Sequence, residues 1–324
     1  MTGSAVLSVR DLHVTYHGSS GAVPAVRGVS LDVHEGETVG VAGESGCGKS
    51  TVAMALLRLL PAGTRTDGEI LLDGEDVLAM RAGRLRAVRW AGASIVFQGA
   101  QHALNPVQRI GDQITEALRV HNIKGTKAGS LLELVGLPTR RADAYPHELS
   151  GGQKQRVMIA MALACDPRLL IADEPTTALD VMVQAQVLAL LERIQSERGL
   201  ATIFITHDLS VLSYVADRLV VMYAGRVAEE GPAAAVLDDP QHPYTRALAG
   251  AFPTIGDSAS RFAPAGLPGD PPDPAAVPPG CAFHPRCPVV IDACPLTDVE
   301  LRPVGDGDRR AACLLVPTVA GTLS

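Results

Sequence analysis

The stretch Gly43-Glu-Ser-Gly-Cys-Gly-Lys-Ser-Thr51 decides the fold, because it fits the pattern G-x-x-x-x-G-K-[ST] of a phosphate-binding loop. It follows an apolar run of strand length at 39–42 and precedes helically spaced apolar residues over 51–60. Glycines let backbone N–H groups turn inward around phosphate oxygens, and the positive end of the following helix dipole points at the same anion. The sequence therefore predicts a nucleotide phosphate site at a strand–loop–helix junction.

The residue types within this loop assign chemical roles. Lys49 is expected to reach the β- and γ-phosphates, Ser50 to ligate Mg²⁺ and Thr51 to support the α-phosphate. The expected nucleotide-binding residues of the loop are Gly43, Ser45, Gly46, Cys47, Gly48, Lys49, Ser50 and Thr51.

A second apolar run, 169–172, ends in the adjacent carboxylates Asp173 and Glu174. Asp173, at the end of the expected strand, is suited to hold Mg²⁺ through its water shell. Glu174 is suited to accept a proton from, or to orient, the water that attacks the γ-phosphorus. Together with the phosphate loop, this pair predicts nucleotide hydrolysis.

The apolar runs are of strand length and lack polar alternation, which is typical of a parallel sheet covered on both faces. They occupy 39–42, 169–172, 202–205 and 219–222, and helical spacing follows over 181–194. The expected fold is α/β with crossover helices. A helix-rich insert at about 99–155 interrupts this alternation.

Leu149-Ser-Gly-Gly-Gln153 is a second glycine-rich turn at the start of a helix, and the helix that follows is basic. We expect Ser150, Gly151, Gly152 and Gln153 to bind an anion. Because this turn belongs to a different subdomain from the phosphate loop, the sequence suggests a nucleotide held between two chains.

These motifs, in this order and spacing over residues 7–255, resemble the ATP-binding subunits of ABC transporters, whose hallmark is the LSGGQ signature. The resemblance implies a RecA-like P-loop NTPase core, ATP and Mg²⁺ as ligands, and a helical signature subdomain. It also implies roles for four residues outside the loop. Tyr16 would stack on adenine, Gln98 would join metal and water to a transmembrane partner, Asp180 would lie in the loop that crosses the dimer interface, and His207 would contact the γ-phosphate.

Two stretches resemble the peptide-importer branch of this family, namely Ala103-Leu-Asn-Pro-Val107 and Gln241-His-Pro-Tyr-Thr-Arg246. The segment 99–102 and the pair Gln153-Lys154 depart from the branch pattern, and we expect such departures to alter coupling or the substrate branch while leaving the ATP chemistry intact. The resemblance implies transmembrane permease subunits, a second ATPase subunit (a paralogue or another copy) and an extracytoplasmic substrate-binding protein. The substrate is di- or oligopeptides, nickel or another small solute.

Charge and hydropathy exclude other classes. There are 28 basic and 35 acidic residues, for a net charge of −7, and no long basic block, which argues against a nucleic-acid partner. No secretory signal or transmembrane run is seen, so we expect a cytoplasmic protein, placed by the resemblance at the membrane's inner face. A soluble ABC ATPase of translation or DNA repair is the alternative, but the interval between Gln98 and Ser150 leaves no room for a long arm.

The composition changes after Phe252, and a domain boundary is expected near residue 255, followed by an extension over 256–324. Seven prolines at 261–280 indicate an extended linker. Four cysteines follow, Cys281, Cys287, Cys294 and Cys313, and four thiolates suit a [4Fe–4S] cluster or Zn²⁺. Four unliganded thiols remain a third possibility. The stretch 280–288 also resembles the cysteine-bearing tail of peptide-importer ATPases.

Overall fold

The computed structural model describes residues 5–18, 21–99, 103–251, 267, 269–305 and 307–316. The chain forms two compact units, each discontinuous in sequence. The first comprises Met1–Ser8, Asp32–Glu37 and Leu71–Ile205, and the second Val9–Leu31, Thr38–Ile70 and Thr206–Ser324. The boundary expected near residue 255 lies outside the described residues, as does most of the unusual segment 99–102.

The first unit contains three parallel strands, β6 (Ala93–Val96), β7 (Leu169–Asp173) and β8 (Ala201–Ile205). Strand β7 lies between the other two, with Ser94 opposite Leu170 and Ile171 opposite Ile203. Every residue of β7 and β8 is buried. This confirms the parallel, doubly covered strands predicted from the apolar runs, and it places Glu174 just beyond the carboxyl end of β7.

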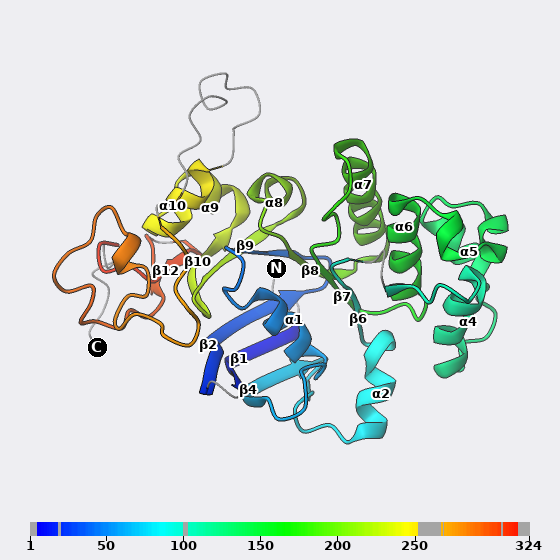
Figure 1. The fold of residues 1–324 in the computed structure, drawn as a ribbon, viewed down its shortest axis with the longest axis horizontal. Coiled ribbons are helices and arrows are strands. Elements are labelled where there is room, and N and C mark those ends of the chain that lie inside the picture. The colour runs from blue at the N-terminus through cyan, green and yellow to red at the C-terminus, as the bar shows by residue number, and fades with distance from the viewer. Residues whose placement is uncertain are drawn as a thin grey trace. The chain divides into compact units, whose positions relative to one another are not determined.

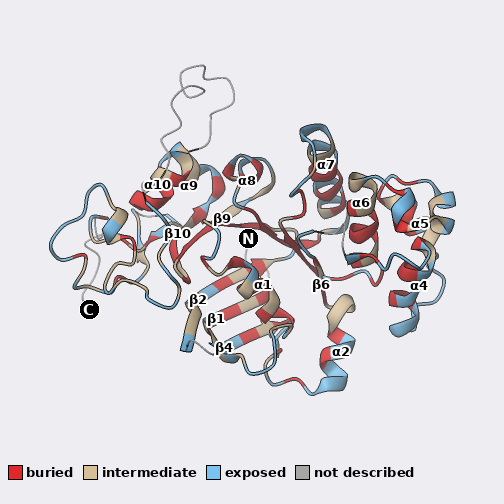
Figure 2. Cartoon of the chain, viewed as in Figure 1, coloured by how far each residue is buried: buried red, intermediate tan, exposed pale blue. Residues whose placement is uncertain are grey.

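The helices of the first unit are α2 (Ala82–Ala91), α4 (Ile110–Val120), α5 (Ala128–Leu134), α6 (Gly151–Ala162) and α7 (Val181–Arg198), with 3₁₀ turns at Thr139–Asp143 and Pro146–Glu148. Helices α4, α5 and α6 pack on one another, and α6 also packs on α7 and β6 (Figure 1). Their buried stripes are visible in Figure 2. In α4 the stripe is Ile110, Gln113, Ile114, Ala117 and Leu118, a spacing of three and four that keeps one helix face buried and mostly apolar.

The second unit contains the strand that leads into the phosphate loop, β3 (Thr38–Ala42), beside the parallel β9 (Arg218–Tyr223). Strand β10 (Arg226–Pro232) returns antiparallel to β9, and the short β12 (Arg310–Ala311) covers its other edge, followed by β11 (Arg302–Pro303). The helices are α1 (Lys49–Leu56), α8 (Leu209–Val215), α9 (Ala233–Asp238) and α10 (Pro243–Gly250). Helix α1 begins at the loop's lysine and ends four residues earlier than predicted.

A second sheet has the order β2 (Gly21–His34), β1 (Ala5–Gly18), β4 (Arg65–Leu72) and β5 (Glu75–Asp76), and most of its residues belong to the second unit. The sequence analysis did not name these strands. They carry mixed polar and apolar residues, in contrast to the continuous apolar runs of the other sheet.

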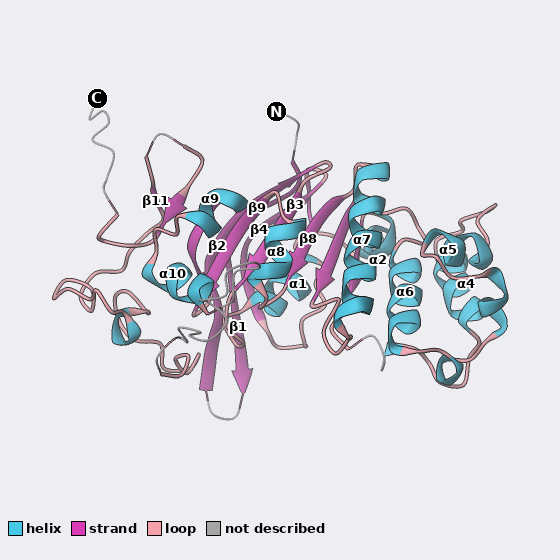
Figure 3. Cartoon of the chain, turned by 90° about the horizontal axis from the view of Figure 1, so that it is seen from above, coloured by secondary structure: helices cyan, strands magenta, loops and turns pink. Residues whose placement is uncertain are grey.

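The described part of the extension contains one 3₁₀ turn, His284–Arg286, and the strands β11 and β12, and is otherwise loop (Figure 3). Neither helix nor strand occurs in 269–280, as expected for a segment so rich in proline. No helix among the described residues is both long and apolar enough to cross a membrane.

Candidate active site

The phosphate loop joins β3 to α1 within the second unit, and two of its glycines are required by its conformation. Gly43 has φ 147° and Gly48 has φ 105°, a region that L side chains rarely adopt. A Cβ at Gly43 would lie 2.3 Å from the carbonyl oxygen of Met222, and one at Gly48 would lie 2.4 Å from that of Ala25. Backbone from other strands therefore closes around the loop, and only glycine fits there.

Lys49 lies folded back over the loop. Its side chain is buried, and its Nζ donates to the carbonyl oxygens of Gly43 at 2.6 Å and Glu44 at 3.0 Å. The Cys47 sulfur lies 3.7 Å from the same Nζ, and burial raises the pKa of this thiol. The ammonium is thus held at the start of α1, where an anion would meet both its charge and the helix N-terminus.

Two further residues predicted to bind the nucleotide belong to the same unit. The Tyr16 hydroxyl lies 3.2 Å from the Thr51 hydroxyl, so the structure brings this tyrosine to the loop. His207 is exposed and lies between β8 and the N-terminus of α8, where Asp208 accepts the backbone N–H of Ser210.

The acidic residues predicted to take part in hydrolysis belong to the first unit, at the carboxyl end of β7. One Glu174 carboxylate oxygen accepts hydrogen bonds from Gln98 Nε2 at 2.7 Å and from the Thr177 hydroxyl at 2.8 Å. The Glu174 backbone is in the left-handed region, with φ 47°, and Asp173 beside it is buried. Strained backbone of this kind persists only where surrounding structure holds it, and it is concentrated at functional sites.

The structure thus brings together Gln98, Asp173 and Glu174, and it adds Thr177, which the sequence analysis missed. The signal available in the sequence was the position of Thr177, three residues after Glu174. A hydroxyl at that spacing can reach the carboxylate within a turn. Because Gln98 and Glu174 are 76 residues apart, their contact depends on β6 and β7 being neighbours.

The signature motif forms a capped helix N-terminus in the first unit. The Ser150 hydroxyl accepts the Gln153 N–H at 3.4 Å, and the Gln153 side chain accepts the Ser150 N–H at 3.2 Å, which is a capping box. A Cβ at Gly152 would lie 2.3 Å from Cγ1 of Val183, so this glycine lets α6 approach α7. Asp180 caps α7, since its carboxylate accepts the Val183 N–H at 3.0 Å.

The four cysteines of the extension line one cavity, together with His242, Phe283 and His284. Cys294 and Cys313 are buried, while Cys281 and Cys287 are half-buried, and burial raises the pKa of both half-buried thiols. In the part of the chain that the structure describes, no group of three or more His, Cys, Asp or Glu side chains is arranged to hold a metal ion. The structure therefore gives no support to the expected iron–sulfur or zinc site.

Comparison with known proteins agrees with this arrangement of motifs. The family model "ABC transporter" matches residues 26–177, and the model "Oligopeptide/dipeptide transporter, C-terminal region" matches residues 228–294. The dipeptide transport ATP-binding protein DppD of Bacillus subtilis is 46% identical over 298 residues, which cover 89% of this chain and 88% of DppD.

The oligopeptide transport ATP-binding protein OppD of Mycobacterium tuberculosis is also 46% identical, over 98% of this chain, although the match spans only 53% of OppD. Among solved structures, the ATP-binding cassette MJ0796, a dimer in a post-hydrolysis state bound to ADP and Pi, is 29% identical. It aligns with a TM-score of 0.62 over 70% of this chain and 98% of the cassette.

The fold and these motifs define an ATP-hydrolysing cassette of the ABC type. More narrowly, the chain belongs to the ABC transporter ATP-binding proteins that carry the oligopeptide/dipeptide transporter C-terminal region. Membership of this family does not favour the alternative function of a soluble ATPase in translation or DNA repair.

Proposed function

We propose that this chain is the ATP-hydrolysing subunit that energises import of dipeptides or oligopeptides through a membrane permease. Family membership supports the peptide class, because the relatives at this level of identity are dipeptide and oligopeptide transport ATP-binding proteins. The observation that carries hydrolysis is the Glu174 carboxylate, held at the end of β7 by Gln98 and Thr177.

In this proposal the loop binds the triphosphate of ATP. Lys49 neutralises the β- and γ-phosphates, Ser50 and Asp173 hold Mg²⁺ with Gln98, and Tyr16 stacks on adenine. When bound, Mg²⁺ would neutralise part of the negative charge of the phosphates. Glu174 orients the attacking water and accepts its proton, while His207 contacts the γ-phosphate.

A second ATPase subunit, either a paralogue or another copy, completes the site by presenting its Ser150–Gln153 turn and Asp180 across the interface. Permease subunits and an extracytoplasmic substrate-binding protein are the other partners, and nucleic acid is not one. The chain would then act at the cytoplasmic face of the membrane as a peripheral subunit. Residues 1–255 would form the ATPase domain, with the helical subdomain at about 99–155, and 256–324 the extension.

The cysteine extension is proposed as a thiolate site, on the ground that Cys281, Cys287, Cys294 and Cys313 line one cavity. An iron–sulfur cluster or zinc would require rearranged and deprotonated thiols. Determination of iron, sulfide and zinc in anaerobically purified protein tests this. A stoichiometric amount of cluster or zinc would establish a thiolate site, and protein lacking all three would leave four unliganded thiols.

The function is tested by uptake of labelled di- and oligopeptides in cells that carry Glu174→Gln in place of the wild-type chain. We expect uptake to be lost and ATP hydrolysis by the assembled complex to fall by about 10²–10³. The matched control is Glu197→Gln, the same chemical change on the exposed face of α7, where the salt bridge to Arg193 is weak.

Wild-type rates of hydrolysis in Glu174→Gln would contradict the role of this glutamate. Normal peptide uptake together with lost ATPase activity would instead contradict the proposal that peptides are the transported substrate. Nickel chelates or another small solute would then be tested next.

A further inference from the structure

Glu44, the second residue of the phosphate loop, is bound by a side chain from the cysteine-bearing extension. Arg286 Nη1 lies 2.7 Å from one Glu44 carboxylate oxygen and Nη2 lies 3.0 Å from the other, which is a bidentate ion pair. The Arg286 side chain is 7% exposed and that of Glu44 is 21% exposed. This pair joins residues 242 positions apart, within the second unit.

The backbone of Glu44 is held as firmly as its side chain. Its N–H donates to the hydroxyl of Tyr244 at 2.8 Å, and its carbonyl oxygen accepts from Lys49 Nζ at 3.0 Å. Tyr244 is fully buried in α10, and burial raises its pKa, so the phenol stays neutral. Because three polar groups of one loop residue are all engaged, the conformation of the loop depends on α10 and on the extension.

A second part of the extension also lies beside the loop. The prolines Pro271, Pro272 and Pro274 line one hollow with the loop residues Glu44, Gly46 and Cys47. Arg286 also donates to the carbonyl oxygen of Gly269 at 3.0 Å, so the ion pair fixes the beginning of this proline-rich segment.

Arg286 is directly coupled to the cysteines. It ends the 3₁₀ turn His284–Arg286 and precedes Cys287, and the turn itself is fixed because the His284 N–H donates to the Cys281 carbonyl at 2.9 Å. The Cys281 N–H in turn donates to the Cys294 carbonyl at 2.9 Å. The turn that carries the guanidinium holding Glu44 is therefore linked by backbone hydrogen bonds to Cys281 and, through it, to Cys294.

We propose that Arg286 is a positioning residue for the nucleotide site, and that through its ion pair with Glu44 the cysteine-bearing extension sets the affinity of the phosphate loop for ATP. The inference rests on the proposed function in that the ligand is ATP. The ion pair holds the loop in one conformation before the nucleotide arrives, so less ordering is left for binding to accomplish.

The test measures the Kd of the full-length chain for ATP with Mg²⁺, by calorimetry, in wild type and Arg286→Gln. We expect the Kd of Arg286→Gln to rise by about fivefold or more, the range of ordinary coupling between sites. In the assembled complex the KM for ATP should rise in parallel, while kcat at saturating ATP stays close to wild type. A loss of folded protein alone would lower the active fraction without changing KM.

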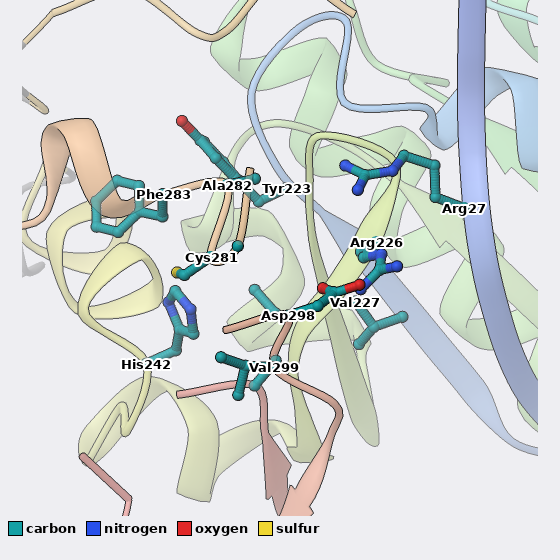
Figure 4. A pocket seen from close by; sticks show the side chains of 13 residues that line it. Arg27, Tyr223, Arg226, Val227, His242, Cys281, Ala282, Phe283, Asp298 and Val299 are labelled. Carbon is teal, nitrogen blue, oxygen red and sulfur yellow. The ribbon is translucent and has the colours of Figure 1, made fainter. Parts of the chain in front are cut away.

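The matched control is Asp298→Asn. Asp298 is also in the extension, but it forms its ion pair with Arg226 of β10 instead of with a residue of the loop (Figure 4). We expect its Kd for ATP to equal that of wild type. Arg286→Lys, which keeps the charge but loses the bidentate geometry, should have a Kd between those of wild type and Arg286→Gln.

A double-mutant cycle of Arg286→Gln with Glu44→Gln tests whether the two side chains act through their ion pair. If the two side chains act through each other, the double variant binds ATP no more weakly than the weaker single variant. The inference is overturned if Arg286→Gln binds ATP as wild type does, if Asp298→Asn weakens binding equally, or if the two single effects add. Failure of the wild-type chain itself to bind ATP would overturn the proposed function as well, which separates the two outcomes.

Discussion

Two helices of this protein begin at glycine-rich turns, and their N-terminal ends are stabilised in different ways. Helix α6 is capped by its own neighbours, since Ser150 and Gln153 satisfy each other's backbone N–H groups. Helix α1 is preceded by Gly48, which has no side chain to offer and adopts a left-handed conformation. The loop before α1 is instead held by Tyr244 and Arg286, which lie 200 and 242 residues from Glu44.

The difference shows two ways of preparing an anion site. A capping box makes the start of α6 stable by local sequence alone, so the signature is recognisable as a short motif. Helix α1 leaves its N-terminal end to a ligand. The shape of the phosphate loop before it is maintained by residues that are distant in the sequence.

The largest effect is expected at the start of α1. Lys49→Ala removes the buried ammonium that the Gly43 and Glu44 carbonyls hold, and with it the positive charge available to the phosphates. We expect ATP hydrolysis by the assembled complex to fall by about 10³, as for other losses of electrostatic stabilisation. Lys124→Ala, at an exposed position, serves as control, and comparable activity in the two variants would remove Lys49 from the site.

Helix α10 provides a third kind of terminus, capped by a buried histidine. His242 Nδ1 accepts the Tyr244 N–H at 3.0 Å, and burial lowers the pKa of His242 to about 4, from 6.5. Between these pH values the unfolded chain takes up a proton that the folded chain does not, so stability falls as the pH falls from about 6.5 to 4. The loss amounts to about 3 kcal/mol.

Urea unfolding at pH 7 and pH 4 measures this. His242→Asn keeps an acceptor for the cap but does not titrate, so we expect it to lose about 3 kcal/mol less than wild type over this interval. The exposed His17→Asn should behave as wild type. Equal pH dependence in wild type and His242→Asn would show that this histidine is not the source.

Replacing each of two loop glycines by alanine should lower the free energy of unfolding by different amounts. Gly48→Ala forces a Cβ to within 2.4 Å of the Ala25 carbonyl oxygen, whereas Gly46→Ala meets nothing within 4 Å, although both positions have positive φ. We expect a loss of free energy of unfolding of about 2–3 kcal/mol at Gly48 and of about 1 kcal/mol at Gly46. Denaturant unfolding of both variants checks this, and equal losses would contradict the close approach of Ala25.

The smallest effect is expected at α6. Ser150→Ala removes the acceptor of the Gln153 N–H and should lower the free energy of unfolding by about 1 kcal/mol, whereas Ser150→Gly should cost a few tenths. Thermal unfolding of the two variants checks the ordering. A cost as large as that of Gly48→Ala would mean that this terminus, too, is held by more than its local cap.

The sequence predicted those parts of the molecule whose signal is local. The four buried strands, the start of α6 and the acids at the carboxyl end of β7 follow from short runs and motifs. The contact of Glu44 with Arg286 could not be predicted, because no periodicity or spacing relates residues that meet only after β10 and the extension have folded back. The same holds for Glu229, a fully buried carboxylate that accepts the backbone N–H groups of Gln241 and His242.

Because β12 pairs with β10, part of the second unit can form only after β12 has been synthesised. The ribosome delivers the phosphate loop early, but β10 stays open along one edge until Arg310 and Ala311 emerge and pair with Glu230 and Glu229. Arg309, which reaches the buried Glu229 carboxylate at 3.2 Å, arrives at the same moment. A nascent chain therefore carries an uncovered edge of β10 from the synthesis of residue 232 until residues 310 and 311 emerge, and the ion pair of Glu229 forms only then.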